Sequence, residues 1–349
     1  MRLRPAALVG GVLGAAAAGV AAGVAVERLA IGRTRLRPDP DARELFGRLP
    51  GIESTVTADD GVVLHAEETG RGAVTVVFVH GYALSLHCWH YQRRDLADVG
   101  RLVFYDQRAH GRSERGPSDH LTVDQLGRDL EAVLTKLVPT GPVVLVGHSM
   151  GGMTIMALAH QRPELFGDRV VGVALVSTSP GKLGEVGFRL PVRVSAVLTG
   201  SVLPQVDRLI GKRPALIERG RRVGSDLAFV MSRRYGFGDD ASPAQVEFVE
   251  RMLAATPVDV ITGFARSIVE HDKYEALDVL AKVPTVVLIG GDDKITPPAL
   301  SDEIAARVAG AELICLPGAG HMVMLERAAL VNLHLRSLVR RAVAAARSR

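Results

Sequence analysis

The chain has 349 residues, of which 47% are hydrophobic and 23% are charged, a balance that excludes a wholly disordered chain and a polytopic membrane protein. Its two cysteines exclude a disulfide scaffold and a cysteine-based zinc or iron–sulfur site. The 42 Lys and Arg residues against 38 Asp and Glu give a net charge of only +4, so we expect no nucleic-acid partner.

The first 35 residues contain a segment that could cross a membrane. Residues 5–26 carry no charge and are mostly Ala, Gly and Val. As a helix they would be about 33 Å long, which is enough to span a bilayer. Arginines flank the segment on both sides, so its orientation stays open. We expect residues 1–35 to be a membrane anchor; a cleaved secretory signal and a frayed tail are the alternatives. Residues 36–50 are predicted to be a linker.

A hairpin and a series of buried strands follow. Residues 53–57 and 62–67 alternate around an Asp-Gly turn at Asp60, which predicts an antiparallel hairpin. Six continuous apolar runs then suit strands that are buried on both faces of a parallel sheet. These runs cover residues 74–79, 101–105, 143–146, 170–176, 285–289 and 312–316.

Helical patterns lie between the strand runs. The predicted helices cover residues 122–138, 149–160, 298–308 and 325–346, the first with Thr122 and Gln125 as a capping box. This alternation predicts an α/β fold, a mostly parallel sheet flanked by helices, with its chemistry beyond the carboxyl ends of the strands. No strand run occurs between residues 180 and 283, which is too long for an ordinary connection. We therefore expect a helical lid over residues 181–280, inserted into a core of residues 51–180 and 281–349.

A candidate nucleophile lies where the third apolar run meets a helix. Residues 147–151 read Gly-His-Ser-Met-Gly, a G-x-S-x-G pattern between a strand and a helix. This is the context of a nucleophile elbow, in which Ser149 sits on a tight turn. The alternative is a glycine-rich turn with an ordinary N-cap serine.

A serine nucleophile needs a histidine base that is oriented by a carboxylate. His321 follows the last strand run in a Gly-Ala-Gly-His loop, whereas His148 is adjacent to the nucleophile and would point elsewhere. Asp292 and Asp293 follow the fifth run, and Asp106 is a competitor that precedes the nucleophile. The chain order Ser, Asp, His is that of α/β-hydrolases.

The oxyanion of a tetrahedral intermediate also needs donors. We expect them to be the backbone N–H groups of Met150, which follows the nucleophile, and of Tyr82, in the His-Gly-Tyr loop after the first run.

With these motifs in order, the sequence resembles the α/β-hydrolase superfamily, in its lid-bearing serine esterase and lipase branch. The resemblance rests on residues 80–82, 106–113, 147–152 and 291–297, and on Gly320-His321 with Glu326-Arg327. It implies that Asp293, four residues before Pro297, is the acid. It also implies no metal or organic cofactor, and a structural loop at 106–113, with Ala109 where glycine is common.

The expected function is hydrolysis of carboxylic esters with medium-chain or lipid-like acyl groups. A thioesterase, a C–C bond hydrolase and a cofactor-free perhydrolase share the same triad. A catalytically silent, membrane-tethered binding module is the alternative from another class. Residues 181–240 carry 11 basic against 6 acidic residues, and the tail after Glu326 carries six Arg and no acid, which suits an anionic membrane surface. Cys88 and Cys315 are predicted to be buried thiols, and the oligomeric state stays open.

Overall fold

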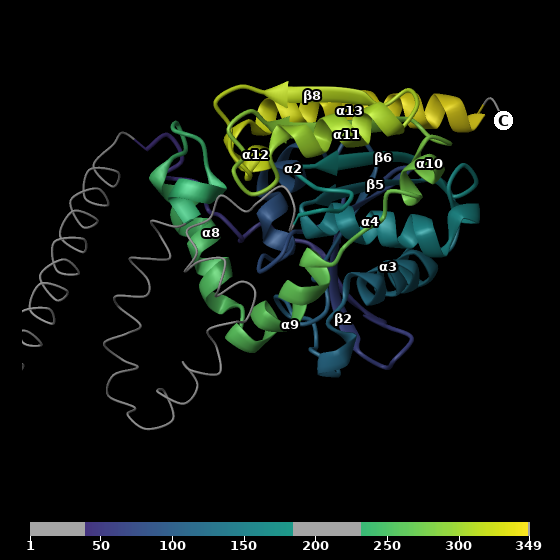
Figure 1. Ribbon diagram of the computed structural model, residues 1–349, viewed down its shortest axis with the longest axis horizontal. Helices are drawn as coiled ribbons and strands as arrows, with labels where there is room; N and C mark the ends of the chain where they lie inside the picture. The colour runs from purple at the N-terminus through teal and green to yellow at the C-terminus, as the bar shows by residue number, and fades with distance from the viewer. Residues whose placement is uncertain (1–38, 184–231, 348–349) are drawn as a thin grey trace, which may run out of the picture.

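The computed structural model describes residues 39–183 and 232–347, and one eight-stranded sheet runs through them (Figure 1). The strands are β1 (Ile52–Thr57), β2 (Val63–Thr69), β3 (Thr75–Val79), β4 (Arg101–Tyr105), β5 (Val143–His148), β6 (Val170–Val176), β7 (Thr285–Gly290) and β8 (Glu312–Leu316). Their order across the sheet is β1-β2-β4-β3-β5-β6-β7-β8. Strands β1, β2 and β4 pair in antiparallel fashion, and all other neighbours are parallel.

Helices cover both faces of this sheet, and two more, α8 and α9, lie beyond the carboxyl ends of its strands (Figure 1). They are α2 (His90–Asp95), α3 (Val123–Leu137), α4 (Met150–Gln161), α8 (Pro243–Ala255), α9 (Val258–Val269), α10 (Ala276–Leu280), α11 (Pro298–Arg307), α12 (Val323–Glu326) and α13 (Ala328–Arg347). Short 3-10 turns occupy Leu86–Trp89, Ser118–His120 and Pro163–Leu165, and a π-helical turn occupies Ser232–Gly236. The predicted α/β fold, with a mostly parallel sheet flanked by helices, is confirmed.

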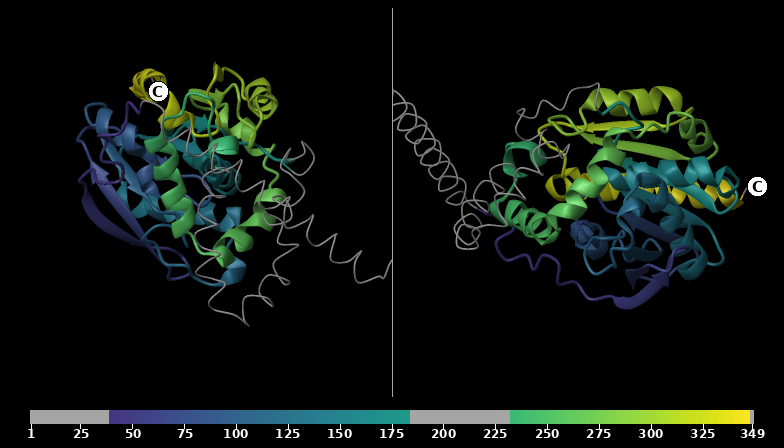
Figure 2. Two further views of the ribbon diagram at one scale, coloured as in Figure 1. Left: turned by 90° about the vertical axis from the view of Figure 1, so that its left-hand side faces the viewer. Right: turned by 60° about the horizontal axis from the view of Figure 1, so that its bottom comes forward.

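Side-chain alternation along the strands builds two hydrophobic cores. Val76 and Phe78 of β3 face a core with α2, α12 and α13, whereas Val77 and Val79 face a core with α3, α4, α10 and α11. Because both faces are covered, the inner strands are apolar at most positions, and polar residues such as Thr75, Arg101 and Thr285 stand at their ends, which is why the strands read as continuous apolar runs. Figure 2 places the hairpin at one side of the molecule and β8 at the opposite side.

The predicted hairpin and the Thr122 cap are confirmed, but the reciprocal half of the capping box is wrong: the Thr122 N–H donates to the His120 oxygen at 2.9 Å, and the Gln125 side chain donates to Asp59 at 2.7 Å. Gly61 adopts φ +87° in the turn between β1 and β2, a conformation that glycine adopts without steric cost. At the start of α3 the Thr122 hydroxyl oxygen accepts the Gln125 N–H at 3.1 Å.

Three expectations near the C-terminus are wrong. Strand β8 is not buried on both faces, because it lies at the edge of the sheet, and it leaves Leu313 and Cys315 exposed. Of the two cysteines only Cys88 is buried. The predicted helix 325–346 is two helices, α12 and α13, because Arg327 between them has a non-helical backbone with φ −128° and ψ 41°.

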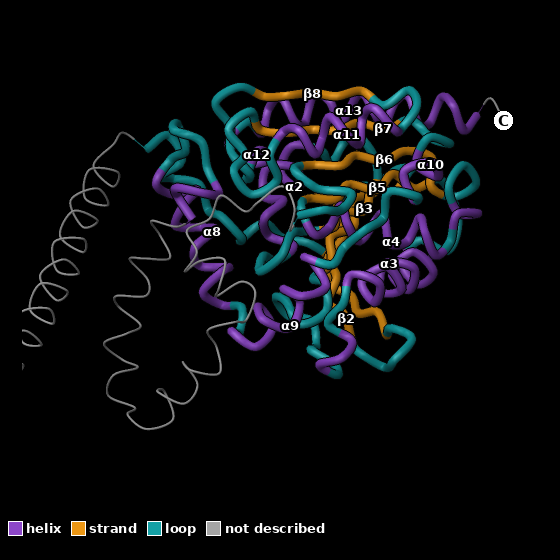
Figure 3. The backbone as a smooth tube through the Cα atoms, in the orientation of Figure 1, coloured by secondary structure: helices purple, strands orange, loops and turns teal. Residues whose placement is uncertain are grey.

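Helices α8 and α9 lie beyond the edge to which the parallel strands point (Figures 1 and 3). They belong to the predicted lid, of which residues 184–231 lie outside the described part of the chain. Residues 39–50, in the predicted linker, pack against this region: Phe46 stacks on Phe248 of α8 with ring centroids 4.7 Å apart.

The predicted anchor at residues 1–35 also lies outside the described residues. Within residues 39–183 and 232–347, no single helix has the length and apolarity needed to cross a bilayer; α8 and α9 reach that threshold only together, as a pair bent by 96°.

Candidate active site

Ser149 occupies a strained turn between β5 and α4. Its backbone has φ +51° and ψ −118°, a conformation that costs free energy for any residue with a Cβ atom. An ordinary N-cap serine has extended backbone and accepts a hydrogen bond from the first turn of its helix. Ser149 has neither feature, so its hydroxyl is not used as a cap.

The flanking glycines permit this turn. A Cβ atom at Gly151 would lie 2.1 Å from the Val79 backbone oxygen, and one at Gly147 would lie 2.5 Å from the Gly151 oxygen. Met150 is the first helical residue of α4, where backbone N–H groups lack an intrahelical acceptor.

The loop after β3 lies against this turn. A Cβ atom at Gly81 would lie 2.6 Å from His148 Nδ1 and 3.2 Å from the Ser149 Cβ atom, so glycine favours this close approach of the loop to the elbow. The next residue, Tyr82, donates its hydroxyl to the Ile261 carbonyl oxygen of α9. His110 supports the same loop, because its Nε2 accepts the Ala83 N–H at 3.1 Å and its Nδ1 lies 2.9 Å from the Arg108 oxygen. Burial lowers the pKa of His110 to about 4, which keeps it neutral in this role.

Asp293 and His321 meet where the loops after β7 and β8 come together. Asp293 Oδ2 lies 2.8 Å from His321 Nδ1, and Asp293 Oδ1 accepts the Ile295 and Thr296 N–H groups at 2.9 Å each. Burial disfavours the charge, but His321 and these two N–H groups outweigh it and hold the pKa of Asp293 below its usual value. Asp293 is therefore an ionised, buried partner for the imidazole.

The two competing carboxylates lie elsewhere. Asp292 is exposed to solvent. Asp106 accepts the backbone N–H groups of Leu86 and Arg112 at 2.8 and 2.9 Å, and burial raises its pKa to about 6. Asp106 thus holds two loops together.

Thr296 is a site residue that the sequence reasoning missed. Its hydroxyl lies 2.9 Å from Asp293 Oδ2 and 3.3 Å from His321 Nδ1. A hydroxyl three residues after an acid could have signalled a local side-chain contact. Its approach to His321 depends on how the two loops pack.

His148, in the elbow, contacts the loop that carries His321. The Nε2 atom of His148 lies 3.0 Å from the His321 backbone oxygen, and the two rings are 4.8 Å apart. Burial and the neighbouring His321 lower the pKa of His148 to about 3, so it donates as a neutral ring. Among the described residues no hydrogen bond joins the Ser149 hydroxyl to His321. Such contacts are often long before substrate binds.

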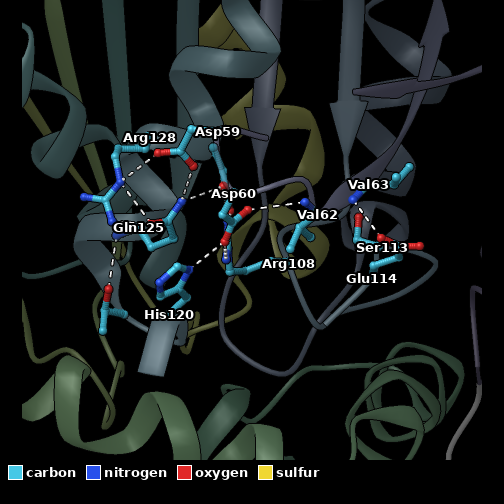
Figure 4. Close-up of polar contacts among 12 residues, drawn as sticks. Asp59, Asp60, Val62, Val63, Arg108, Ser113, Glu114, His120, Gln125 and Arg128 are labelled. Carbon is cyan, nitrogen blue, oxygen red and sulfur yellow. Dashed lines mark hydrogen bonds and ion pairs between the residues drawn. The ribbon is translucent and has the colours of Figure 1, made fainter. Parts of the chain in front are cut away.

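The loop Asp106–Ser113 is anchored by Arg108. Its fully buried guanidinium donates to both carboxylate oxygens of Asp129 in α3, each at 2.6 Å, and to Asp60 in the hairpin turn at 2.7 and 3.2 Å. Figure 4 shows Asp60 between Arg108 and His120, whose Nδ1 lies 2.7 Å away. Arg108 and His120 hold the pKa of Asp60 well below its usual value, even though burial opposes this. The loop thus has a structural role.

A separate cleft of about 510 Å³ lies between the start of α3 and the C-terminal half of α9. It contains none of the five residues predicted for the site. Within the part of the chain that the structure describes, no three His, Cys, Asp or Glu residues are grouped to hold a metal ion.

The sequence and the fold of this chain are similar to those of known proteins. A model described as the alpha/beta hydrolase family matches residues 76–333. A non-heme haloperoxidase of Rhodococcus erythropolis is 30% identical over 293 residues, covering 81% of this chain and 98% of that one. An acetyltransferase component of an acetoin cleaving system from Pseudomonas putida is 28% identical over 274 residues; the match covers 78% of this chain and 65% of that protein's length. The structure of a thermophilic esterase from Thermogutta terrifontis superposes with a TM-score of 0.66 at 25% identity, covering 83% of this chain and 99% of that one.

Proposed function

Because the chain belongs to the alpha/beta hydrolase family, whose members are hydrolases, we propose that it cleaves carboxylic esters through Ser149, His321 and Asp293. The observation that carries this proposal is the 2.8 Å contact of His321 with a buried, ionised Asp293, in loops that adjoin a strained serine elbow. Similarity to the Thermogutta esterase supports the same reaction class.

In this reaction His321 takes the proton of the Ser149 hydroxyl as its oxygen attacks the ester carbonyl. The Met150 and Tyr82 N–H groups stabilise the resulting oxyanion. Collapse of the intermediate breaks the ester bond, and His321 returns the proton to the departing alcohol. A water molecule then attacks the acyl-enzyme in the same way and releases the carboxylic acid. Asp293 holds the tautomer in which Nε2 can accept the proton.

The proposed substrates are medium-chain or lipid-like esters, met at an anionic membrane surface under a helical lid. The basic residues of segment 181–240 and of the C-terminal tail support this surface. Assays with and without anionic vesicles, across short, medium and long acyl chains, test both expectations.

The direct test is hydrolysis of a nitrophenyl ester panel by wild-type protein, by Ser149→Ala and by Ser118→Ala, an exposed control. We expect the first substitution to abolish turnover and the control to retain it. Hydrolysis by Ser149→Ala at the wild-type rate would refute the proposal.

A second candidate is perhydrolysis, which the similarity to a protein named a non-heme haloperoxidase favours. Here hydrogen peroxide replaces water at the acyl-enzyme, so that a peracid leaves and the Ser149 hydroxyl is restored. In the test, acetic acid acylates Ser149 with loss of water, and hydrogen peroxide then releases the peracid. Formation of this peracid, lost in Ser149→Ala, distinguishes the activity from simple hydrolysis.

A further inference from the structure

The loop that carries His321 needs restraints from outside itself. It runs Pro317-Gly318-Ala319-Gly320-His321, and Gly318 adopts φ +68°. Glycines leave a backbone free to adopt many conformations. Two hydrogen bonds from neighbouring segments restrain the loop. The Asp292 N–H donates to the Ala319 oxygen at 2.9 Å, and His148 Nε2 donates to the His321 oxygen at 3.0 Å.

A third restraint comes from residues 232–240, which we call the return segment and which lead into α8 within the predicted lid. Met322 donates its N–H to the Gly236 oxygen at 2.8 Å. A Cβ atom at Gly238 would lie 2.1 Å from the Gly318 oxygen, and one at Gly320 would lie 2.5 Å from the Phe237 carbonyl carbon. The two backbones are therefore in direct contact.

The return segment also reaches the loop of the acid. Lys294, the residue after Asp293, donates its ammonium group to the Arg234 carbonyl oxygen at 3.1 Å. One segment thus lies against both loops that carry the Asp293–His321 pair.

The half-buried carboxylate of Glu326 joins the two backbones. Its Oε1 accepts the Gly320 N–H at 2.8 Å, and its Oε2 accepts the Gly238 N–H at 2.7 Å. Only an acceptor with two oxygens serves both donors, because a glutamine amide would turn an NH₂ group toward one of them. Gly320 directly precedes His321, so the position of Gly320 fixes the position of the His321 backbone that carries the imidazole.

We propose that Glu326 is a positioning residue, which fastens the return segment to the His321 loop and holds the imidazole against Asp293. This inference rests on the proposed function for its effect on turnover. Misplacing a reacting group by about 1 Å can cost about 100-fold in rate.

Kinetics of three variants test the proposal. We expect Glu326→Ala to lower kcat for ester hydrolysis by about 10- to 100-fold with KM changed by less than about threefold, because substrate contacts stay intact. Glu326→Gln keeps one of the two hydrogen bonds and should lose less. The control Glu312→Ala removes a partly exposed partner of Arg341 and should match wild type. A folded Glu326→Ala protein with wild-type kcat would overturn the proposal.

Amide hydrogen exchange supplies a readout that needs no activity. In Glu326→Ala we expect exchange to speed up by at least about tenfold in both 236–240 and 318–322, with β5 and β6 unchanged. Unchanged exchange in these two segments would refute the proposal that Glu326 fastens the return segment to the His321 loop, even if turnover fell. A wild-type chain without esterase activity would refute the proposed function. The exchange result would still decide whether Glu326 fastens the return segment to the His321 loop.

Discussion

Two neighbouring aspartates, Asp292 and Asp293, offer a matched test of the site at the scale of single residues. Only Asp293 lies against His321, while Asp292 is exposed. Asparagine at 293 would present an amide to Nδ1 and favour the wrong tautomer of the imidazole. We expect Asp293→Asn to lower kcat for ester hydrolysis by about 10⁴-fold and Asp292→Asn to stay near wild type. The reverse ranking in steady-state assays would contradict the assignment of the acid.

Ala109 shows the physical cost of one departure from the family pattern. It adopts φ +63° in the structural loop, where a Cβ atom is strained by about 1–2 kcal/mol. Glycine relieves this strain but loses more entropy on folding. We expect Ala109→Gly to raise the free energy of unfolding by about 0.5–1 kcal/mol in urea denaturation. Ala97→Gly, at an exposed site with ordinary backbone, should not raise it. A lower stability for Ala109→Gly would show that the strain is relieved elsewhere.

Among the elements, the hairpin, the loop after β4 and helix α3 depend on one side chain. Arg108 bridges Asp60 and Asp129, so Arg108→Met leaves two carboxylates without their cation. We expect a loss of about 3–5 kcal/mol of unfolding free energy. Arg115→Met breaks only the exposed pair with Asp259 and should cost less than about 1 kcal/mol. Equal losses of unfolding free energy in the two variants, measured by chemical denaturation, would mean that the buried network stabilises the fold no more than an exposed ion pair does.

Elements buried on both faces were the most predictable from sequence. The expected ranges for β4 and β6 match the structure residue for residue, because each contains a run of apolar residues that is buried in the sheet. The elbow was equally visible, since a strand, a glycine-flanked serine and a helix follow one another along the chain. By contrast, Thr296 and Glu326 act across loops that meet only in the folded chain. Residues of that kind leave no local pattern. The exposed Cys315 was missed for a similar reason, because the sequence does not say which strand lies at the edge.

At the scale of the whole molecule, buried histidines make stability depend on pH. Burial lowers the pKa of six histidines: His80, His87, His90, His110, His148 and His271. Burial raises the pKa of three carboxyls: Asp106, Asp129 and Glu326. Below about pH 6.5 the unfolded chain protonates its histidines while the folded chain does not, so acid favours unfolding. The three carboxyls take up protons more readily when folded and oppose part of this loss.

With more histidines than opposing carboxyls, we expect the free energy of unfolding to fall by at least about 1.4 kcal/mol between pH 6 and pH 5. Urea denaturation at the two pH values measures this difference. A stability that stays level or rises over this interval would mean that these histidines are protonated in the folded chain.

Covalent labelling tests most directly whether Ser149 is an activated nucleophile. Folded wild-type protein is treated with a fluorophosphonate, and the modified residue is identified by peptide mass spectrometry. We expect one phosphonate adduct on Ser149, formed at least about 100-fold more slowly in His321→Ala, because the serine then lacks its base. A folded protein that takes up no label at Ser149 would contradict a nucleophilic role for this serine and favour a silent binding module.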